Sequence, residues 1–249
     1  MRNITSLSNE EIKSIASLKD SKERYAQKKF IAEGVRTITT LAQGTMKLSA
    51  LYITPELLEA AHAITSAEKI VIISQKVMQK ISQTVSPSGI LAVFEMPDNP
   101  MPDALTPGLV LAEISDPGNM GTLIRTAAAL NIKSIVAVGG VDPFGPKVIQ
   151  STAGTIGLLN VFTWNWETLV ANKGSLKLHA LVVKDGNSPD TIEKNSALLV
   201  VGSEAHGIDP EWLAQCDDRI TIPMPGNTES LNAAIAGSIA AYQVFAKNN

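Results

Sequence analysis

Arg125 stands where an α/β protein would place a ligand-binding residue. It belongs to the segment DPGNMGTLIRTAAAL (residues 116–130), in which Asp-Pro-Gly-Asn turn chemistry directly precedes a helical pattern. The turn follows the apolar run LVLAEIS, and open α/β sheets bind their ligands in the crevice at the carboxyl ends of the strands. Taken alone, an arginine on a helix is more often a solvated or salt-bridged residue. Its position makes Arg125 a candidate for contact with a ligand.

Two further loops share the character of this first one. The three segments are SDPGNMG, VGSEAHGID and IPMPGNTESLN, and each combines a backbone-permissive glycine with small polar or charged side chains. One such loop is a weak signal, but three that converge at strand ends indicate a pocket. The glycine patterns G-x-G-x-x-G and G-x-x-x-x-G-K-[ST] do not occur, so a standard dinucleotide or P-loop site is disfavoured.

The elements that must position these loops alternate between strands and helices. The apolar runs LVLAEIS, SIVAVGG, HALVV and ALLVVG are continuous, which is typical of strands covered on both faces, and helical patterns lie between them. The second half of the chain therefore predicts a parallel, doubly wound sheet. In the first half, LSALYIT, KIVIIS and ILAVFE predict strands. One helix is expected to begin at Ser8, in a capping box with Glu11, and another to lie between Gly34 and Gly44.

A proline-rich segment separates the two halves. Residues 97–108 (PDNPMPDALTPG) hold four prolines, which disfavour both helix and central strand. We therefore expect residues 1–97 and 109–249 to form two domains, with 98–108 as a linker. Residues 1–97 hold 12 Lys and Arg against 9 Asp and Glu, whereas residues 98–249 hold 9 against 15. The run KDSKERYAQKK is the kind of basic cluster that phosphate backbones attract, although a solvated helix face explains such a run equally often.

The composition excludes several classes of protein. The single cysteine, Cys216, excludes an internal disulfide framework and a cysteine-based zinc site, and the three histidines are scattered, so no metal is expected. No apolar run approaches the length of a spanning helix, and the first residues lack the apolar core of a signal peptide. We expect a soluble, cytoplasmic protein.

The three loops resemble the ordered motifs of a known enzyme family. DPGNMGTLIRTAAAL, LLVVGSEAHGID and ITIPMPGNTESLNAAIAGSIAAY are similar, in order and separation, to the motifs of the SpoU (TrmH-like) RNA 2′-O-ribose methyltransferases of the SPOUT superfamily. KKFIAEGVRTI and TVSPSGILAVFE resemble the L30e-like substrate-binding domain of two-domain members. The resemblance implies a parallel sheet with a trefoil knot, S-adenosylmethionine held bent in the knot, and a homodimer whose active site lies near the subunit interface.

The resemblance also assigns residues by position in the motifs. The expected catalytic residues are Asn119, Arg125, Glu204, Ser230 and Asn232. The expected cofactor-binding residues are Gly202, Ile222, Met224 and Leu231. The expected RNA-binding residues come instead from the basic first half of the chain, and they are Lys22, Arg24, Lys28, Lys29 and Arg36. Without the resemblance, plainer interpretations stay open. Asn119 suits the N-cap of the following helix, Glu204 suits a surface carboxylate, and Ser230 and Asn232 suit caps or turns.

Methyl transfer to a ribose 2′-hydroxyl needs that hydroxyl aligned behind the methyl group and something that removes or accommodates its proton. The resemblance suggests Arg125 as the general base, but a guanidinium is a poor base because its pKa ordinarily lies above about 12. We expect Arg125 instead to grip the phosphate beside the target ribose and to support the developing oxyanion, which leaves the base unassigned. Glu204 is expected to order Arg125 or a backbone amide, while Ser230 and Asn232 hold the loop or the ribose hydroxyls.

The resemblance therefore predicts an S-adenosylmethionine-dependent RNA 2′-O-methyltransferase. A separate basic module suits a large structured RNA, so ribosomal RNA is the first candidate substrate and tRNA the second. A catalytically silent RNA-binding relative and another α/β nucleotide enzyme stay open as alternatives. The intact catalytic positions weigh against the silent relative, and the missing glycine patterns weigh against the other enzyme.

Overall fold

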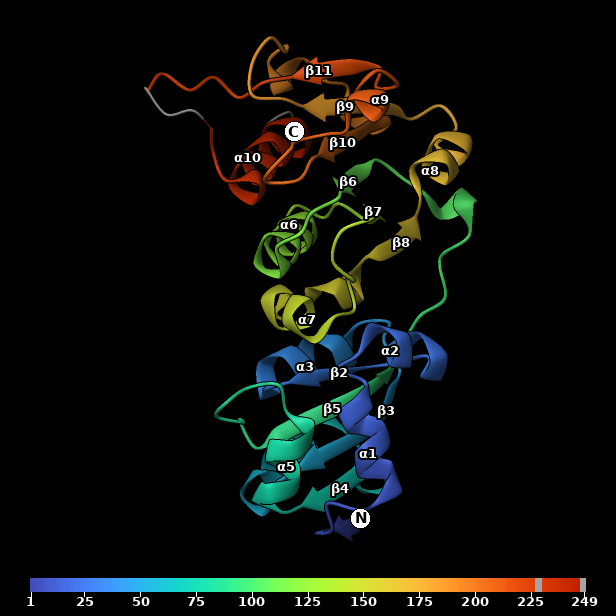
Figure 1. Cartoon of the computed structure of the whole chain (residues 1–249), viewed down its shortest axis with the longest axis vertical. Coiled ribbons are helices and arrows are strands. Elements are labelled where there is room, and N and C mark those ends of the chain that lie inside the picture. Colours follow the sequence, from blue (N-terminus) through green and yellow to red (C-terminus); the bar gives the residue numbers. More distant parts are fainter. Residues whose placement is uncertain (227–229, 247–249) are drawn as a thin grey trace. The chain divides into compact units, whose positions relative to one another are not determined.

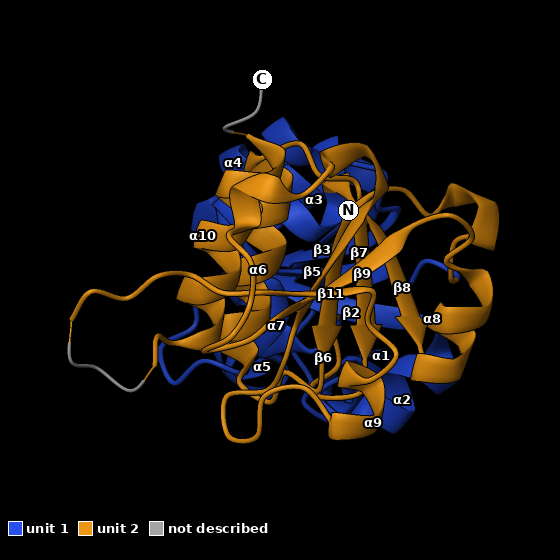
Figure 2. Cartoon of the chain, turned by 90° about the horizontal axis from the view of Figure 1, so that it is seen from above, with its two compact units in different colours: residues 1–98, 144–157 blue, residues 99–143, 158–249 orange. Residues whose placement is uncertain are grey.

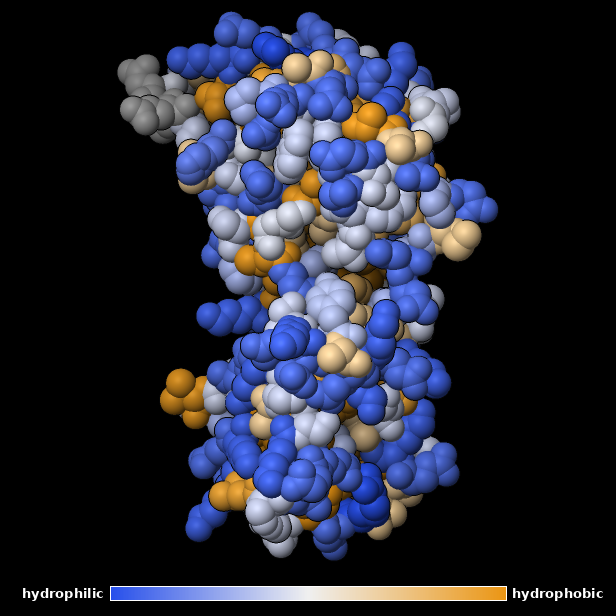
Figure 3. Space-filling model, turned by 45° about the vertical axis from the view of Figure 1, so that its right-hand side comes forward, coloured by the Kyte–Doolittle hydropathy of each residue, from blue (hydrophilic) through white to orange (hydrophobic). Residues whose placement is uncertain are grey.

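The structure is a computed structural model that describes residues 1–226 and 230–246. The chain forms two compact units, residues 1–98 with 144–157 and residues 99–143 with 158–249 (Figure 2). Each unit has one sheet with helices packed on it. On the face drawn in Figure 3, hydrophilic side chains prevail and apolar residues form only small groups. Within the described ranges, no helix has the length and apolar character needed to cross a membrane.

Unit 1 is built on a five-stranded mixed sheet in the order β1-β4-β3-β5-β2 (Figure 1). β1, β4 and β3 are parallel, and β5 runs antiparallel to both β3 and β2. Apolar side chains of α1 and α5 pack on the sheet and form its core with Ile31, Tyr52 and Leu91. The strands are β1 (Arg2–Ile4), β2 (Lys29–Glu33), β3 (Leu48–Ile53), β4 (Ile70–Ile73) and β5 (Ile90–Glu95). The helices are α1 (Glu10–Ser17), α2 (Ser21–Gln27), α3 (Val35–Gln43), α4 (Leu58–Ile64), α5 (Gln75–Ile81) and α7 (Pro146–Thr152).

The start of α1 differs from the sequence-based expectation. The three strands expected in this half are confirmed as β3, β4 and β5, and the helix expected between the two glycines is α3. The capping box at Ser8 is wrong, because Asn9 caps α1 and its Oδ1 accepts hydrogen bonds from the amides of Glu11 (2.9 Å) and Ile12 (3.4 Å). The Ser8 hydroxyl instead bonds to Ser6. Asparagine is at least as strong a cap as serine, and the sequence offers both side by side.

Residues 144–157 lie between two strands of unit 2 in the sequence but pack in unit 1. The Phe144 ring lies 5.4 Å from the Phe30 ring of β2. Gly154 has a φ of +87°, and a Cβ at this position would lie 2.4 Å from the carbonyl oxygen of Thr37 in α3. Such close approach of two backbones requires glycine. This segment therefore belongs to the core of unit 1, which a boundary drawn from the proline-rich segment cannot show.

Unit 2 contains a six-stranded, wholly parallel sheet in the order β11-β9-β10-β6-β7-β8. The predicted doubly wound sheet is confirmed, whereas the trefoil knot stays a prediction. In Figure 2, α6 and α10 lie on one side of the sheet and α8 on the other. The strands are β6 (Gly108–Ala112), β7 (Ser134–Val138), β8 (Asn160–Trp164), β9 (Lys177–Leu181), β10 (Ala197–Val201) and β11 (Asp218–Ile220). The helices are α6 (Pro117–Ala129), α8 (Trp166–Asn172), α9 (Pro210–Leu213) and α10 (Ala233–Phe245).

Helices α6 and α10 pack closely against each other. The hydroxyls of Thr126 and Ser238 share a hydrogen bond of 2.9 Å between the two helices. Gly237 lies at this contact, where a Cβ would come within 2.6 Å of Cδ2 of Leu123 and would make that side chain shift. Both helices begin with a side-chain cap, from Asp116 in α6 and from Asn232 in α10. The pairing brings these amino-terminal ends together beside the carboxyl edge of the sheet.

Candidate active site

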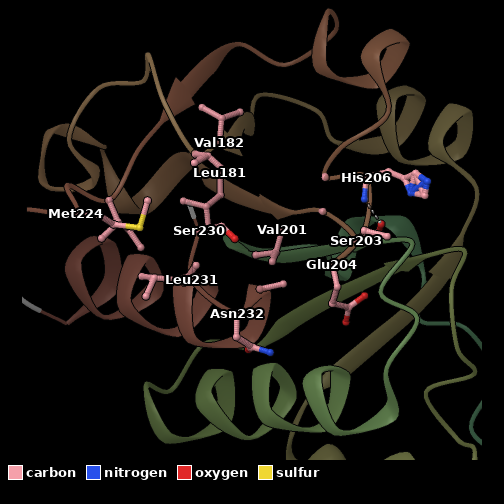
Figure 4. Close-up of a pocket in the computed structure, with 17 residues that line it drawn as sticks. Leu181, Val182, Val201, Ser203, Glu204, His206, Met224, Ser230, Leu231 and Asn232 are labelled. Carbon is pink, nitrogen blue, oxygen red and sulfur yellow. Dashed lines mark hydrogen bonds between the residues drawn. The ribbon is translucent and has the colours of Figure 1, made fainter. Parts of the chain in front are cut away.

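A cavity of about 530 Å³ lies where β9 and β10 end in unit 2. This volume falls within the usual range for sites that bind small molecules and cofactors, roughly 300–1,000 Å³. All four expected cofactor-binding residues line it, as do three of the expected catalytic residues, Glu204, Ser230 and Asn232. Figure 4 shows apolar side chains, Leu181 and Met224 among them, on one side of the cavity, and Glu204 with Asn232 on the side next to α6. The second and third loops therefore meet at one pocket, as their sequences predict.

Glu204 is held by two residues of the first loop. Its Oε1 accepts a hydrogen bond of 2.7 Å from Nδ2 of Asn119, and its Oε2 accepts one of 2.8 Å from the hydroxyl of Ser115. The Ser115 amide also donates to Oε2 over 3.3 Å. Sequence reasoning missed Ser115, whose only signal is its place at the end of the apolar run that leads into the loop. Glu204 is an exposed loop carboxylate, as the plainer interpretation expects, and the structure also ties it to the first loop.

Asn119 and Asn232 extend this connection to α10. Nδ2 of Asn232 donates to Oδ1 of Asn119 over 3.1 Å, while Oδ1 of Asn232 accepts from the amides of Ala234 and Ile235. Asn232 is therefore both the N-cap of α10 and a partner of Asn119. The N-cap of α6 is Asp116, whose Oδ1 accepts from the Asn119 amide over 2.8 Å. The N-cap interpretation of Asn119 is thus wrong, and its side chain is left to link Glu204 with Asn232.

The electrostatics of Glu204 follow from these contacts. Partial burial by itself raises the pKa of the carboxyl group, but hydrogen bonds from Asn119, from its own backbone amide and from Ser115 outweigh that effect and lower the pKa to about 2. Glu204 is therefore ionised at neutral pH. A carboxylate with so low a pKa is a weak base, and its charge serves to hold hydrogen-bond donors in place.

Arg125 stands apart from this network. It lies on α6 six residues beyond Asn119, its side chain is exposed, and it does not line the cavity. Its guanidinium forms no hydrogen bond or ion pair with any residue in the part of the chain that the structure describes. Glu204 therefore does not order Arg125 within one chain.

Gly202 is required by the shape of the loop that carries Glu204. Ser203 and Gly207 exchange two backbone hydrogen bonds, of 2.9 and 3.0 Å, which close a tight turn. A Cβ on Gly202 would lie 2.3 Å from the backbone carbon of Gly207. Any larger residue at position 202 must therefore displace the turn. The cavity depends on Gly202 through this close backbone approach as well as through its place in the lining.

The expected RNA-binding residues of unit 1 fall into two groups. Lys22, Lys28, Lys29 and Arg36 are exposed, and Lys28 lies 3.3 Å from the carboxylate of Asp98. Arg24 is only 4% exposed, and its Nη1 donates to the carbonyl oxygens of Leu18 (3.0 Å) and Lys19 (2.9 Å). Its guanidinium is used to close the turn between α1 and α2. Arg24 is therefore excluded from the proposed RNA surface because of its burial.

No metal site accompanies the cavity in the described residues, since no three His, Cys, Asp or Glu side chains gather there or elsewhere in those ranges.

Trp166 is buried and its ring stacks on that of Trp212, 5.0 Å away. This pair packs in the core on the α8 side of the sheet.

Comparison with known families decides what this arrangement is. Residues 107–242 match the SpoU rRNA Methylase family, and residues 9–92 match the MRM3-like substrate binding domain. The chain belongs to the SpoU rRNA methylase family. The first match covers every strand of unit 2 and every expected catalytic residue, and the second covers the expected RNA-binding residues of unit 1.

Relatives of this SpoU methylase match it over nearly its whole length. A 23S rRNA guanosine 2′-O-methyltransferase of Bacillus subtilis, RlmP, is 27% identical over 98% of this chain and 99% of its own. An uncharacterized tRNA/rRNA methyltransferase of Synechocystis is 30% identical over 96% of this chain and 92% of its own. Among solved structures, an AdoMet-bound rRNA methyltransferase from Sinorhizobium meliloti superimposes with a TM-score of 0.85, at 26% identity over 98% of this chain and 97% of that one.

Proposed function

We propose that this SpoU methylase transfers a methyl group from S-adenosylmethionine to a ribose 2′-hydroxyl of ribosomal RNA. The observation that carries the proposal is the chain of hydrogen bonds from Glu204 through Asn119 to Asn232, built beside a cavity of cofactor size. It is supported by the family match and by relatives that are named as rRNA methyltransferases.

The residues that line the cavity fit S-adenosylmethionine. Apolar side chains, including Leu181, Ile222, Met224 and Leu231, offer the kind of surface on which an adenine ring packs. The turn around Gly202 brings backbone amides and carbonyls to the same cavity. When bound, the cofactor supplies a methyl group on a positively charged sulfur. The ionised Glu204 lines the same cavity and provides negative charge near it.

The roles of the chain's own residues follow from the network. Asn119 and Asn232 have fixed orientations, because each side-chain amide both donates and accepts in the observed bonds. They hold the ends of α6 and α10 at the cavity, where the target ribose must be aligned. Ser230 is exposed at the lining and has a hydroxyl to offer to a ribose. Arg125 binds the phosphate next to the target nucleotide and supports the oxyanion as the hydroxyl loses its proton.

Capture of the RNA is the task of unit 1. Lys22, Lys29 and Arg36 are exposed and have no ion-pair partner among the described residues. Such cations attract a phosphate backbone and give the salt-dependent part of RNA affinity. The match of this region to a substrate binding domain supports the same role. Lys28 contributes less, because Asp98 lies beside it.

We propose further that the protein acts as a homodimer in the cytoplasm, where ribosomal RNA is its substrate. α10 exposes an apolar stripe formed by Ile235 (52% exposed), Ile239 (37%) and Tyr242 (57%), spaced so as to share one face, and Leu231 (37%) lies just before the helix. A second copy of the chain would cover this stripe. Because α6 packs beside α10, a dimer on this face also sets Arg125 near the interface. Arg125 does not line the cavity of its own chain, so in such a dimer it would act at the cavity of the second copy.

The test is cofactor binding followed by label transfer. Isothermal calorimetry should show that the full-length protein binds S-adenosylmethionine. Incubation with S-adenosylmethionine labelled on its methyl group should then label ribosomal RNA, and the label should be recovered as a 2′-O-methylated nucleoside. Label recovered in tRNA instead would replace the proposed substrate, and cofactor binding without any transfer to RNA would contradict the proposed activity.

A further inference from the structure

We propose that Ser115 is a positioning residue of the active site, which acts by fixing the carboxylate of Glu204. This inference rests on the proposed function and deepens it. Ser115 follows β6 and Glu204 follows β10, two neighbouring strands of the sheet. Both the hydroxyl and the backbone amide of Ser115 donate to Oε2 of Glu204, over 2.8 and 3.3 Å. The serine thus grips one oxygen of the carboxylate at two points.

The Glu204 carboxylate is exposed, so its orientation depends on the hydrogen bonds that it accepts. It lies in the exposed turn closed by Ser203 and Gly207, and a glutamate side chain has three rotatable bonds. Asn119 donates to Oε1 over 2.7 Å. One hydrogen bond leaves the carboxylate free to turn about it, whereas bonds to both oxygens from different directions fix its plane. The three donors come from Ser115 and Asn119, two residues only four positions apart, so they move together with the start of α6.

The orientation of Asn119 depends on this fixed carboxylate. An ionised Glu204 carboxylate can accept hydrogen bonds but cannot donate them, so the amide nitrogen of Asn119 must face it. The amide oxygen of Asn119 then faces Nδ2 of Asn232. Loss of the Ser115 hydroxyl lets the carboxylate rotate, and the orientations of both asparagines loosen with it. Ser115 itself does not line the cavity. Its effect on the reaction therefore passes through Glu204, which is the meaning of a positioning role.

The first experiment compares serine variants in the full-length protein. Ser115→Ala should lower the single-turnover rate of RNA methylation about tenfold, because a hydrogen bond to a charged group is lost, and should leave the KM for RNA nearly unchanged. Ser115→Thr keeps the hydroxyl and should recover most of the rate. Ser175→Ala is the matched control, since Ser175 is an exposed serine just before β9, at the other end of that strand from the cavity. A wild-type rate for Ser115→Ala would overturn the inference.

A double-mutant cycle separates positioning from general stabilisation. If Ser115 acts through Glu204, Ser115→Ala should cause no further loss of rate in a protein that already carries Glu204→Gln. An equal loss in both backgrounds would overturn the inference.

A measurement that does not depend on enzyme activity tests the inference separately from the proposed function. The side-chain amide resonances of Asn119 in NMR spectra should shift, and their hydrogen exchange should quicken, in Ser115→Ala but not in Ser175→Ala. Unchanged Asn119 resonances would overturn the inference even if the enzyme methylates RNA. A wild-type protein that methylates no RNA would refute the proposed function, whereas the NMR comparison would still decide whether Ser115 positions Glu204.

Discussion

Asn119 donates a hydrogen bond of 2.7 Å to Glu204 across 85 positions of sequence. The bond joins the start of α6 to the turn after β10, and it helps to lower the pKa of the Glu204 carboxyl group to about 2. At neutral pH the carboxylate is therefore charged and a weak base. Glu204 is thus suited to hold Asn119 in place and unsuited to take the proton of a ribose hydroxyl.

Replacement of Glu204 tests this assignment. Glu204→Gln keeps the size of the side chain but turns one acceptor into a donor, so that it must oppose the donors of either Asn119 or Ser115. We expect the single-turnover methylation rate to fall at least about tenfold. Glu211→Gln, an exposed glutamate on α9, should keep the wild-type rate. Equal rates for the two variants would show that the network does not serve the reaction.

Arg125 is predicted to bind a phosphate and not to act as a base. Arg125→Ala should lower the rate about 10² to 10³-fold, the usual effect of removing one preorganised donor, while the affinity for S-adenosylmethionine changes little. We expect the cofactor affinity to change little because Arg125 does not line the cavity. Single-turnover kinetics and calorimetry measure the two quantities, and a large loss of cofactor affinity would place the guanidinium in the cofactor site.

The lysine variant separates the two roles of Arg125. Arg125→Lys keeps a positive charge, so under phosphate binding it should recover part of the rate, with a nearly flat pH profile between about 7 and 9. A lysine that acted as a base would give a rate that climbs roughly tenfold per pH unit toward its ordinary pKa near 10.4. A steep climb, with methyl transfer shown to be the slow step, would refute the phosphate role.

The exposed cations of unit 1 should govern RNA capture. The double variant Lys22→Glu with Lys29→Glu should lower kcat/KM for ribosomal RNA and weaken its dependence on salt, because phosphate contacts are lost, without changing cofactor affinity. The matched control is Lys133→Glu with Lys177→Glu. Both lysines are exposed in unit 2, Lys133 directly before β7 and Lys177 at the start of β9. An equal effect of both double variants would mean that net charge, and not this surface, attracts the RNA.

His179 should make the stability of the fold depend on pH. It is 6% exposed, and neither ring nitrogen has a hydrogen-bond partner in the described residues. Burial lowers its pKa, although Asp218 and Asp217 act in the opposite direction and Lys177 adds to the lowering. In the unfolded chain this histidine has its ordinary pKa near 6.5. Below that pH the unfolded chain therefore binds a proton that the folded protein binds only at lower pH. The free energy of unfolding should fall as the pH drops below about 6.5.

Denaturant unfolding between about pH 7.5 and 5.5 measures this effect. His179→Gln removes the titrating group, so the free energy of unfolding should fall less over this range than it does in the wild type. His62→Gln, at an exposed histidine of α4, should leave the wild-type dependence unchanged. The same pH dependence in wild type and His179→Gln would show that the buried ring is not responsible.

Patterns of types and spacing predict the sheet of unit 2 and a pocket at the ends of its strands, whereas the residues expected to bind the cofactor come from the family resemblance. The apolar runs are continuous because β6, β7 and β10 are buried along their whole length. The loops after β6 and β10 are joined by Glu204, as expected for the ends of neighbouring parallel strands. Such features depend on local pattern and on the rule that strand ends share one edge.

Other features depend on contacts between distant residues and leave no local signal. Arg24 sits in a basic run, yet its side chain turns inward to the carbonyl groups of Leu18 and Lys19. Ser115 ends the apolar run before the first loop, but that place does not reveal its contact with a residue 89 positions away. The packing of residues 144–157 in unit 1 is likewise decided by Phe30 and α3, far away in sequence.

The most direct test of the whole account is a map of 2′-O-methylated nucleotides in ribosomal RNA from cells with and without this gene. A 2′-O-methyl group blocks alkaline cleavage of the adjoining phosphodiester, so each modified position can be located by sequencing the hydrolysed RNA. We predict that at least one protected position disappears without the gene, returns when the wild-type protein is supplied, and stays absent when Arg125→Ala is supplied. Identical maps of ribosomal RNA from both cells would contradict the proposed function.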